Sequence, residues 1–537
     1  MPIAATIKPN LYKDSVALMR VSQRVLEEPG VTRATLLMGT PANKAMLADA
    51  GLMRSELERA VPADLMIVVE AESAAAIASA QRAIAGMLDA APAAAGALAA
   101  TASPPPSLAL AAARGEAPDV AQISVPGAYT GAEALKALKQ GMHAFIFSDN
   151  VPLAEECALK ELATRKGLLV MGPDCGTALL RGVPLGFANV VRRGAIGLVG
   201  ASGTGLQEVM CGIHALGHGI SHAIGTGSRD VYDAVGGATM CAAIDLLAAD
   251  PATRVIGIVS KPPATRVADV VLQHLARAGK PAAVLFLGAD AAAAPWPGPT
   301  VAVATLHDAA VAAVALADGR AVPQASSDDV DRALVERETR AFASSQRFAH
   351  GLYSGGTFCI EAQLLWSALG LVVRSNAPLA STAADDVERG DAHRAIDYGA
   401  DEYTIGRPHP MIDLRTRIEA LAQDARDPSV AAVVLDIVLG YGSHPDPARA
   451  LAPAIRDARA EATRAGRHLT VIAFVCGTEQ DPQRLSVQQA ALRDAGAIVA
   501  SHSTAAAQLA GAIAVAAIAM RDRREPSHAA RSSVPTR

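Results

Sequence analysis

Ala195-Ile-Gly-Leu-Val-Gly200 runs directly into Ala201-Ser-Gly-Thr-Gly205 and a helical pattern over 206–216, and this stretch decides the fold. An apolar run that ends in a glycine-rich turn and opens a helix is typical of the first unit of a parallel α/β sheet. The same order recurs at Tyr353-Ser-Gly-Gly-Thr357, before a helical pattern over 358–369. Ligands of parallel sheets bind at the carboxyl ends of the strands, so both turns are predicted to lie at binding edges.

Strands alternate with helical patterns along most of the 537 residues, which indicates an α/β protein with several doubly wound parallel sheets. At ~100 to 200 residues per domain, this length predicts three or four domains. The first 88 residues are predicted to form a small α/β domain of βαβ type. The Ala-, Pro- and Ser-rich segment that follows has no periodicity, as is typical of a linker. The mixed-charge run 328–340 is predicted to be a solvated helix between two domains.

The composition excludes several classes of protein. Hydrophobic residues make up 51% of the chain, charged residues 19% and aromatic residues 3%, and the formal net charge is −5. These values favour a globular protein with small-molecule or protein partners over a disordered or nucleic-acid-binding one. The first residues lack the charged and apolar regions of a signal peptide. The uncharged, Ala-rich run 503–520 is predicted to pack on a domain rather than to span a membrane.

Neither the cysteines nor the histidines have the spacing of metal ligands. The six cysteines are at least 18 positions apart, so we expect a reducing, cytoplasmic environment and no zinc site. His214, His218 and His222 follow one another at intervals of four, but Gly217 and Gly219 interrupt the helix that would align them. No metal site is therefore predicted.

The two glycine-rich turns are candidate anion sites. Free N–H groups and the positive dipole end at a helix N-terminus attract phosphate and other oxyanions, and hydroxyl groups in the turns add donors. Such a turn can equally be only a tight connection, but two of them in one chain could hold a single phosphate between them. Neither turn fits the GxxxxGK[ST] pattern of a P-loop. The candidate residues are Ser202, Gly203, Thr204, Gly205, Ser354, Gly355, Gly356 and Thr357.

These motifs, together with others along the chain, resemble succinyl-CoA synthetase. Residues 121–304 are similar to its α subunit, notably in Val125-Pro126 and Gly172-Pro-Asp-Cys-Gly176. The region from Ser354 onward resembles the C-terminal domain of its β subunit. The motifs that carry this second similarity are Ser354-Gly-Gly-Thr357, Asp397-Tyr-Gly-Ala-Asp401, the stretch 427–436 and Gly440-Tyr-Gly-Ser-His444. A fused α and β core with an extra N-terminal domain resembles the FdrA family, as do 186–194 and Ser260-Lys-Pro-Pro263.

The resemblance implies a division of the chain into Rossmann-like and flavodoxin-like domains. The expected parts are a small α/β N-terminal domain at 1–88, an Ala/Pro linker at 89–117, a Rossmann-like CoA-binding-type domain at 118–193, a flavodoxin-like domain of the α-subunit type at 194–325, a linker helix at 326–345, a flavodoxin-like domain similar to the C-terminal domain of the β subunit at 346–522, and a disordered tail at 523–537.

Three departures from succinyl-CoA synthetase bear on the chemistry. The phosphorylated histidine of that enzyme would follow Phe286-Leu-Gly-Ala-Asp290, but this sequence continues there with four alanines and a proline. The glutamate that supports this histidine would stand at Ser260-Lys261-Pro262, where this sequence has no glutamate. The glycine-rich turn of its CoA domain would precede Val120, inside the linker, which makes CoA a doubtful ligand. About 50 residues separate Ala304 from Ser354, too few for an ATP-grasp domain.

Further candidate residues lie at predicted strand ends. Lys261 could pair with a phosphate or a carboxylate, or be a solvated loop lysine. His444 could act as a general acid or base, because the usual pKa of histidine is near neutrality, or it could be structural. Cys175 could be a nucleophile or only a small buried hydrophobe. A substrate or CoA-like pocket is expected at Pro126, Gly127, Asp174, Cys175 and Gly176.

Similarity to FdrA proteins implies an enzyme subunit for carbamoyl transfer in ureide (allantoin) nitrogen use, in which oxalurate and phosphate give oxamate and carbamoyl phosphate. Its expected ligands are phosphate or carbamoyl phosphate, and no other cofactor is certain. Its expected partners are further subunits and a ureide or carboxylate substrate. One alternative is a subunit of an ADP-forming acyl-CoA synthetase, with CoA and nucleotide entering through other chains. The other is a non-catalytic scaffold or regulatory subunit with an effector-binding N-terminal domain.

The sequence makes a prediction about phosphorylation. Because the chain encodes neither the ATP-grasp domain nor the histidine segment of succinyl-CoA synthetase, the purified protein should take up no label from γ-phosphate-labelled ATP. The label is counted after alkaline and acid treatment, since phosphohistidine is acid-labile. Acid-labile labelling of any histidine would contradict this prediction.

Overall fold

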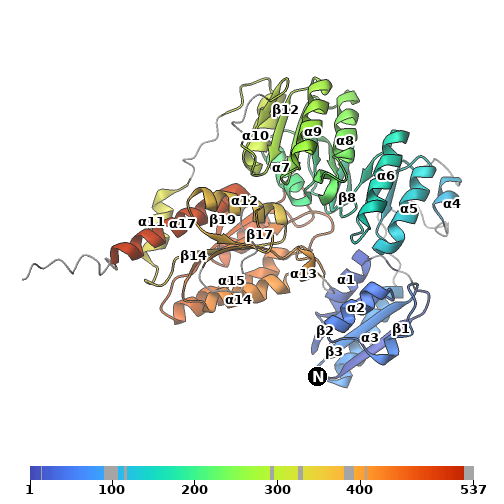
Figure 1. Cartoon of the computed structure of the whole chain (residues 1–537). Helices are drawn as coiled ribbons and strands as arrows, with labels where there is room; N and C mark the ends of the chain where they lie inside the picture. Colours follow the sequence, from blue (N-terminus) through green and yellow to red (C-terminus); the bar gives the residue numbers. More distant parts are fainter. Residues whose placement is uncertain are drawn as a thin grey trace, which may run out of the picture. The chain divides into compact units, whose positions relative to one another are not determined.

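The computed structural model describes residues 1–11, 13, 15–89, 107–113, 118–290, 296–323, 330–379, 392–404 and 408–524. They form two compact units, of which the first comprises 1–174 and 401–413 and the second the remaining residues (Figure 1). Most of the predicted linker at 89–117 and of the tail at 523–537, and the segment 291–295, lie outside the described residues. Within that predicted linker, Leu108–Ala113 form the short helix α4, which the loss of periodicity did not indicate.

The N-terminal part of the first unit is a three-stranded antiparallel sheet in the order β1-β3-β2. Its strands are β1 (Ile3–Lys8), β2 (Val31–Met38) and β3 (Leu65–Ala71), and its helices are α1 (Ser15–Val25), α2 (Pro41–Asp49) and α3 (Ala74–Asp89), with a 3-10 turn, η1 (Ser55–Leu57). β1 and β2 both run antiparallel to β3 and therefore parallel to each other. The predicted βαβ unit is thus present in split form, with β3 inserted between its two strands.

The first unit continues with a half-Rossmann arrangement of three parallel strands in the order β4-β5-β6. The elements are β4 (Val120–Ile123), α5 (Gly127–Lys139), β5 (His143–Ile146), α6 (Leu153–Lys166) and β6 (Val170–Met171). The unit is completed by α13 (Asp401–Thr404) and the residues up to 413, which return to it from later in the chain.

The second unit contains two sheets of the same topology. The first has parallel strands in the order β10-β9-β11-β12-β13, extended beyond β10 by the antiparallel hairpin β7-β8. Its strands are β7 (Thr177–Leu180), β8 (Val183–Gly186), β9 (Arg193–Gly200), β10 (Ile220–Gly225), β11 (Val255–Ser260), β12 (Ala282–Phe286) and β13 (Thr300–Ala302). Its helices are α7 (Gly203–Ala215), α8 (Ala238–Ala249), α9 (Thr265–Ala278) and α10 (Leu306–Ala317), with a 3-10 turn, η2 (Ser228–Val231).

The other sheet has the order β15-β16-β14-β17-β18-β19, and its paired strands are parallel. Its strands are β14 (Phe348–Tyr353), β15 (Val373–Arg374), β16 (His393–Asp397), β17 (Val430–Val438), β18 (Thr470–Cys476) and β19 (Ile498–Ala500). Its helices are α11 (Arg332–Arg340), α12 (Gly356–Ala368), α14 (Arg415–Arg426), α15 (Pro447–Arg464), α16 (Leu485–Asp494) and α17 (Ser503–Arg524).

The first sheet follows the flavodoxin-like order 2-1-3-4-5, counted from β9. The second follows the same order, counted from β14, when its two-residue edge strand β15 is left out, so the predicted fold class is confirmed. The central strands are continuous apolar runs because helices cover both faces: all nine residues of β17 are buried, and so are all seven of β18. In this strand order the chain reverses direction between the first and third strands. That edge is where ligands of such sheets bind, and it lies beside the two glycine-rich turns.

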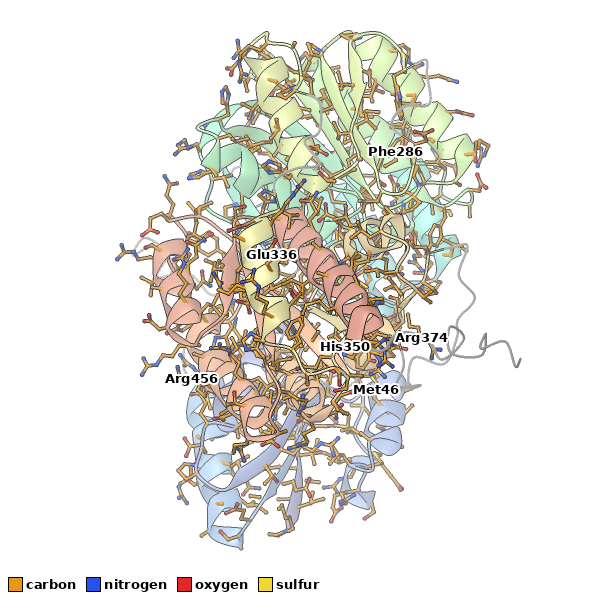
Figure 2. All side chains as sticks on the ribbon, turned by 90° about the vertical axis from the view of Figure 1, so that its left-hand side faces the viewer. Met46, Phe286, Glu336, His350, Arg374 and Arg456 are labelled. Atoms are coloured by element: carbon orange, nitrogen blue, oxygen red, sulfur yellow. The ribbon has the colours of Figure 1, made fainter. Side chains whose placement is uncertain are left out.

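The C-terminal helix α17 packs on this second sheet, as predicted. It contacts α12 and β17, and α11, which carries Glu336, runs beside it (Figure 2). By length and composition alone, residues 503–521 could cross a membrane, but 56% of this stretch is buried inside the protein. Such burial is typical of a core helix in a globular domain.

A buried polar network joins the two flavodoxin-like halves. Asn189, which precedes β9, donates from Nδ2 to the Leu439 carbonyl and to Asp481 Oδ2, both at 3.0 Å. Gln207 of α7 donates to Asn189 Oδ1 at 3.0 Å, and Asp481 Oδ1 accepts from the Val190 N–H at 2.7 Å. Because these hydrogen bonds are directional and join residues of both halves, the network fixes how one half is placed against the other.

A buried carboxylate, Glu361 of α12, makes a second connection between the halves. It accepts hydrogen bonds from the Leu306 N–H (2.8 Å) and from the hydroxyls of Ser503 (2.8 Å) and Thr504 (3.0 Å). Burial raises the pKa of Glu361 from 4.5 to about 7, with a smaller contribution from the nearby Glu208 carboxylate. The N-termini of α10 and α17 are therefore held by a carboxyl group that titrates near neutral pH.

The raised pKa of Glu361 predicts a pH-dependent stability. The folded state binds its proton more tightly than the unfolded state, so the free energy of unfolding should fall as the pH rises from 4.5 to 7, by up to about 3 kcal/mol from this group. E361Q should remove this slope and keep the contacts, because an amide can accept from Leu306 and donate to Ser503. Urea unfolding between pH 4.5 and 8 measures the slope, with E336Q as the control, because the Glu336 side chain of α11 is exposed. Equal slopes in E361Q and wild type would contradict the prediction.

Candidate functional site

The turn between β9 and α7 is capped by Ser202, whose Oγ accepts from the Gly205 N–H at 2.9 Å. The strand reaches this turn through Gly200, where a β-carbon would lie 2.4 Å from the Val259 carbonyl oxygen, so only glycine fits there. Serine is a preferred N-cap because its oxygen satisfies one of the free N–H groups at the start of the helix. The hydroxyl of Ser202 therefore stabilises the helix end from within.

The turn between β14 and α12 is held by a buried carboxylate instead. Asp436, fully buried on β17, accepts from the Ser354 N–H at 2.7 Å and from the Ser354 hydroxyl. Arg417 of α14, also buried, lies 3.4 Å from Asp436 Oδ1 and donates to the Leu352 carbonyl at 3.1 Å. The donors of Ser354, predicted to face an anion, are thus already bonded to Asp436.

The two turns meet, and their predicted convergence is confirmed. Ser202 Oγ and Thr357 Oγ1 are hydrogen-bonded to each other across the two halves. A β-carbon on Gly355 would lie 2.4 Å from Thr204 Cγ2, and one on Gly205 would lie 3.1 Å from Thr357 Cγ2. Gly355 is therefore needed for the close approach of the helices, and it does not provide space for a ligand.

The first residues of the two helices, Gly203 and Gly356, are half-buried, in contrast to the buried residues around them. A β-carbon on Gly203 would lie 3.3 Å from the hydroxyl of Thr177, which is 1% exposed and has no hydrogen-bond partner among the described residues. A β-carbon on Gly356 would lie 2.7 Å from Asp397 Oδ2 and 3.5 Å from Lys261 Nζ. We define these five residues, Thr177, Gly203, Lys261, Gly356 and Asp397, as the helix-end site.

The helix-end site combines positive groups with one carboxylate. Two helix N-termini, each worth roughly half a positive charge, meet here, and the Lys261 ammonium group lies beside the start of α12. Asp397, at the end of β16, is mostly buried, and its Oδ1 accepts from the Gly399 N–H at 2.9 Å. The site can therefore bind an anion at the helix ends and, at Asp397, a neighbouring group that donates N–H or O–H.

His444 lies on the loop that follows β17, at the same edge of the sheet as the turn after β14. Its Nδ1 accepts from the Asp446 N–H at 3.0 Å, and its carbonyl accepts from Gln483 at 3.1 Å. With Nδ1 an acceptor, the neutral ring carries its proton on Nε2. These bonds fix the ring at that edge, while its role in proton transfer stays a prediction.

The predicted pocket residues divide between the two units. Pro126, Gly127 and Asp174 belong to the first unit, where a β-carbon on Gly127 would lie 2.4 Å from the Asp149 carbonyl oxygen. Cys175 and Gly176 belong to the second, where the buried Cys175 thiol donates to the Thr177 carbonyl at 3.5 Å. Gly176 adjoins the helix-end site, because its Cα would be 4.0 Å from a β-carbon on Gly203.

Sequence reasoning missed Thr177, Asp397, Arg417 and Asp436 as functional positions. Asp397 and Asp436 both stand in motifs quoted for the resemblance, and each ends or nearly ends a parallel strand. A carboxylate at the end of a predicted parallel strand could have indicated a functional position from the sequence. Thr177 follows the predicted pocket by one residue, and nothing in its local pattern indicates an unpaired hydroxyl.

Three family models match the chain. A CoA-ligase domain matches residues 352–513, a CoA-binding domain matches 191–288, and the domain described as "AllF, heavy metal-associated domain" matches 1–104. The CoA-binding match covers the β9–α7 turn, whereas the sequence reasoning assigned a CoA-binding-type domain to 118–193. The sequence analysis made CoA a doubtful ligand because no glycine-rich turn precedes Val120. The CoA-binding model matches a different region, 191–288.

Two individual proteins also have sequences similar to this chain. The chain is 40% identical to the E. coli K12 protein YahF over 509 residues, which are 94% of this chain and 97% of YahF. It is 28% identical to the ADP-forming sulfoacetate-CoA ligase subunit SauD of Bilophila wadsworthia over 177 residues, 32% of this chain and 59% of SauD.

Among solved structures, the apo form of a dinucleotide-forming acetyl-coenzyme A synthetase 1 from Ca. Korarchaeum cryptofilum is 18% identical, with 76% of this chain and 85% of that chain covered and a TM-score of 0.30.

The fold, the turns and the domain matches define a protein of the acyl-CoA synthetase or CoA-ligase type, in the succinyl-CoA synthetase superfamily. Within that class the chain belongs to the FdrA family, to which YahF, similar over nearly its whole length, is also related.

The helix-end geometry predicts different effects for two glycine substitutions. G203D places a carboxylate among the N–H donors with its β-carbon in tolerable space, so phosphate affinity should fall about 100-fold or more, the usual effect of losing oxyanion donors. G355A forces a β-carbon against Thr204 and should mainly lower the melting temperature.

Calorimetric titration with phosphate and thermal melting distinguish the two effects. G86D serves as control, because a β-carbon on this helical glycine meets nothing within 4 Å. Wild-type phosphate affinity in G203D would mean that the turns only connect strand to helix.

Proposed function

We propose that this protein is a subunit of a group-transfer enzyme that moves a carbamoyl group between oxalurate and phosphate, with oxamate and carbamoyl phosphate as products. The observation that carries the proposal is the meeting of two helix N-termini beside Lys261 and Asp397. Helix ends and an ammonium group suit a phosphate, and a carboxylate suits the N–H groups of a ureide. One site thus offers matching groups for both halves of the reaction.

In the proposed reaction, a phosphate oxygen attacks the carbamoyl carbon of oxalurate and the bond from that carbon to the oxamate nitrogen breaks. The phosphate loses a proton and the leaving nitrogen gains one, so the atoms balance without a further reactant. The N–H groups of Gly203 and Gly356 and the Lys261 ammonium would hold the phosphate and the charge that develops on it. Asp397 would orient the carbamoyl group, and His444 would deliver the proton to nitrogen.

A second candidate is a subunit of an ADP-forming acyl-CoA ligase. The CoA-binding match over 191–288, which includes Gly203 of the helix-end site, favours this candidate. The similarity to SauD, a subunit of such a ligase, also favours it. An unpaired buried hydroxyl at Thr177 and the two half-buried glycines also suit a phosphate of CoA, which would bring a thiol as acyl acceptor. The sequence at 291–295 supplies no histidine for a phosphoenzyme. In both cases we propose that partner subunits complete the enzyme.

The two candidates are distinguished by their acceptors. Full-length protein, isolated with its copurifying subunits, is incubated with oxalurate and phosphate, and carbamoyl phosphate is followed by phosphorus NMR. We expect phosphate-dependent formation, lost by at least 100-fold in K261M and unchanged in K139M, which alters an exposed lysine of α5. H444A should lose about 10²- to 10⁴-fold in rate and change the pH profile, while phosphate still binds. Turnover only with CoA and ATP would favour the ligase and refute carbamoyl transfer.

A further inference from the structure

The N-terminal domain matches a family described by heavy-metal association, yet its residues do not fit such a metal. Soft cations such as Cu(I), Zn²⁺ and their heavier relatives are bound in proteins mainly by cysteine thiolates and histidine imidazoles. Residues 1–104 contain no cysteine and no histidine. The whole matched region therefore lacks both ligand types.

Two buried methionines and one aspartate of this domain, which could be weaker ligands, are already used for packing or hydrogen bonding. Met38 and Met66 are 4% and 0% exposed, and they belong to two hydrophobic clusters that include alternate residues of the same sheet. Asp64 uses its two oxygens to accept from the N–H groups of Asn10 and Val61, both at 3.0 Å. In the described part of the chain, no three His, Cys, Asp or Glu residues group as metal ligands would.

The domain does hold a segment from much later in the chain. Residues 401–413 belong to the same compact unit as 1–174, and Gln23 Nε2 of α1 donates to the Ile412 carbonyl at 2.7 Å. Met411 and Ile412 are 5% and 2% exposed, so their side chains are packed rather than solvated. The His409 carbonyl accepts from the N–H groups of Ile412 (2.7 Å) and Asp413 (3.0 Å), which folds the segment into a turn. We call residues 408–413 the returning segment.

The returning segment is joined through the backbone to the site on both sides. Asp397 of the helix-end site ends β16, four residues before the first residue of 401–413. On the other side, Arg417 lies four residues after Asp413, and it fixes Asp436, which holds the Ser354 turn. Along the sequence, the returning segment therefore lies between the two carboxylates near the start of α12.

We propose that the N-terminal domain is a metal-free clamp that binds the returning segment. Heavy-metal binding is not its role in this chain, because the ligand types are missing. The clamp rests on the hydrogen bond from Gln23 to the Ile412 carbonyl of the segment, whose Met411 and Ile412 side chains are buried.

Hydrogen exchange of the full-length protein, read by mass spectrometry, tests both parts. Added Cu(I) or Zn²⁺ should leave exchange in peptides of 1–89 unchanged, and increased protection there would overturn the metal-free assignment. Q23L should raise exchange over 408–426 about fivefold, the factor that corresponds to one hydrogen bond. I412A should act in the same direction, and Q81L, on the exposed side of α3, should have no effect.

Unchanged exchange over 408–426 in both Q23L and I412A would overturn the clamp. Raised exchange there in both variants, with Q81L equal to wild type, supports it. Phosphate affinity, measured by calorimetry, tests the proposed function separately from the clamp.

Discussion

The contact between the N-termini of α7 and α12 is the constraint on which the rest of the second unit depends. Two positive dipole ends repel each other, and at this junction they are joined by the Ser202 and Thr357 hydroxyls. The buried carboxylate of Asp436 offsets part of this charge at the α12 turn, and Arg417 in turn balances Asp436. The half-buried N–H groups of Gly203 and Gly356 are left as positive groups that an anion would neutralise.

This contact is maintained by polar groups that lie far apart in the sequence. Asn189, Gln207 and Asp481 bond one half to the other, while Glu361 ties α12 to the starts of α10 and α17. Such networks have directional bonds, so they fix position more sharply than apolar packing alone. The flavodoxin-like halves supply rigid strand ends, and the network brings the two strand-end turns together. The proposed reaction needs this arrangement, because a phosphate held by one helix end alone would lack the second set of donors.

The N-terminal domain shows how a scaffold can be kept without the chemistry that its family description suggests. Its split βαβ arrangement is complete, and both faces of its sheet carry hydrophobic clusters. The thiolates and imidazoles that soft metals require are missing from its sequence. Its contact with residues 401–413 is instead a protein interaction, in which the Gln23 side chain donates to the Ile412 backbone carbonyl.

The sequence by itself determined the strand–turn–helix units, the α/β class and the resemblance to the FdrA family, because these depend on local periodicity and on short motifs. It also indicated that the two turns meet. The tertiary structure was needed to show which turn residues stay partly exposed: a β-carbon on Gly355 would meet Thr204, Ser354 is bonded to Asp436, and Gly203 and Gly356 are half-buried. Thr177 and Asp397 could not be assigned from the pattern. Their neighbours at the site are 26 and 41 positions away along the chain, and packing between elements, which no local pattern records, decides which side chains are left beside the helix ends.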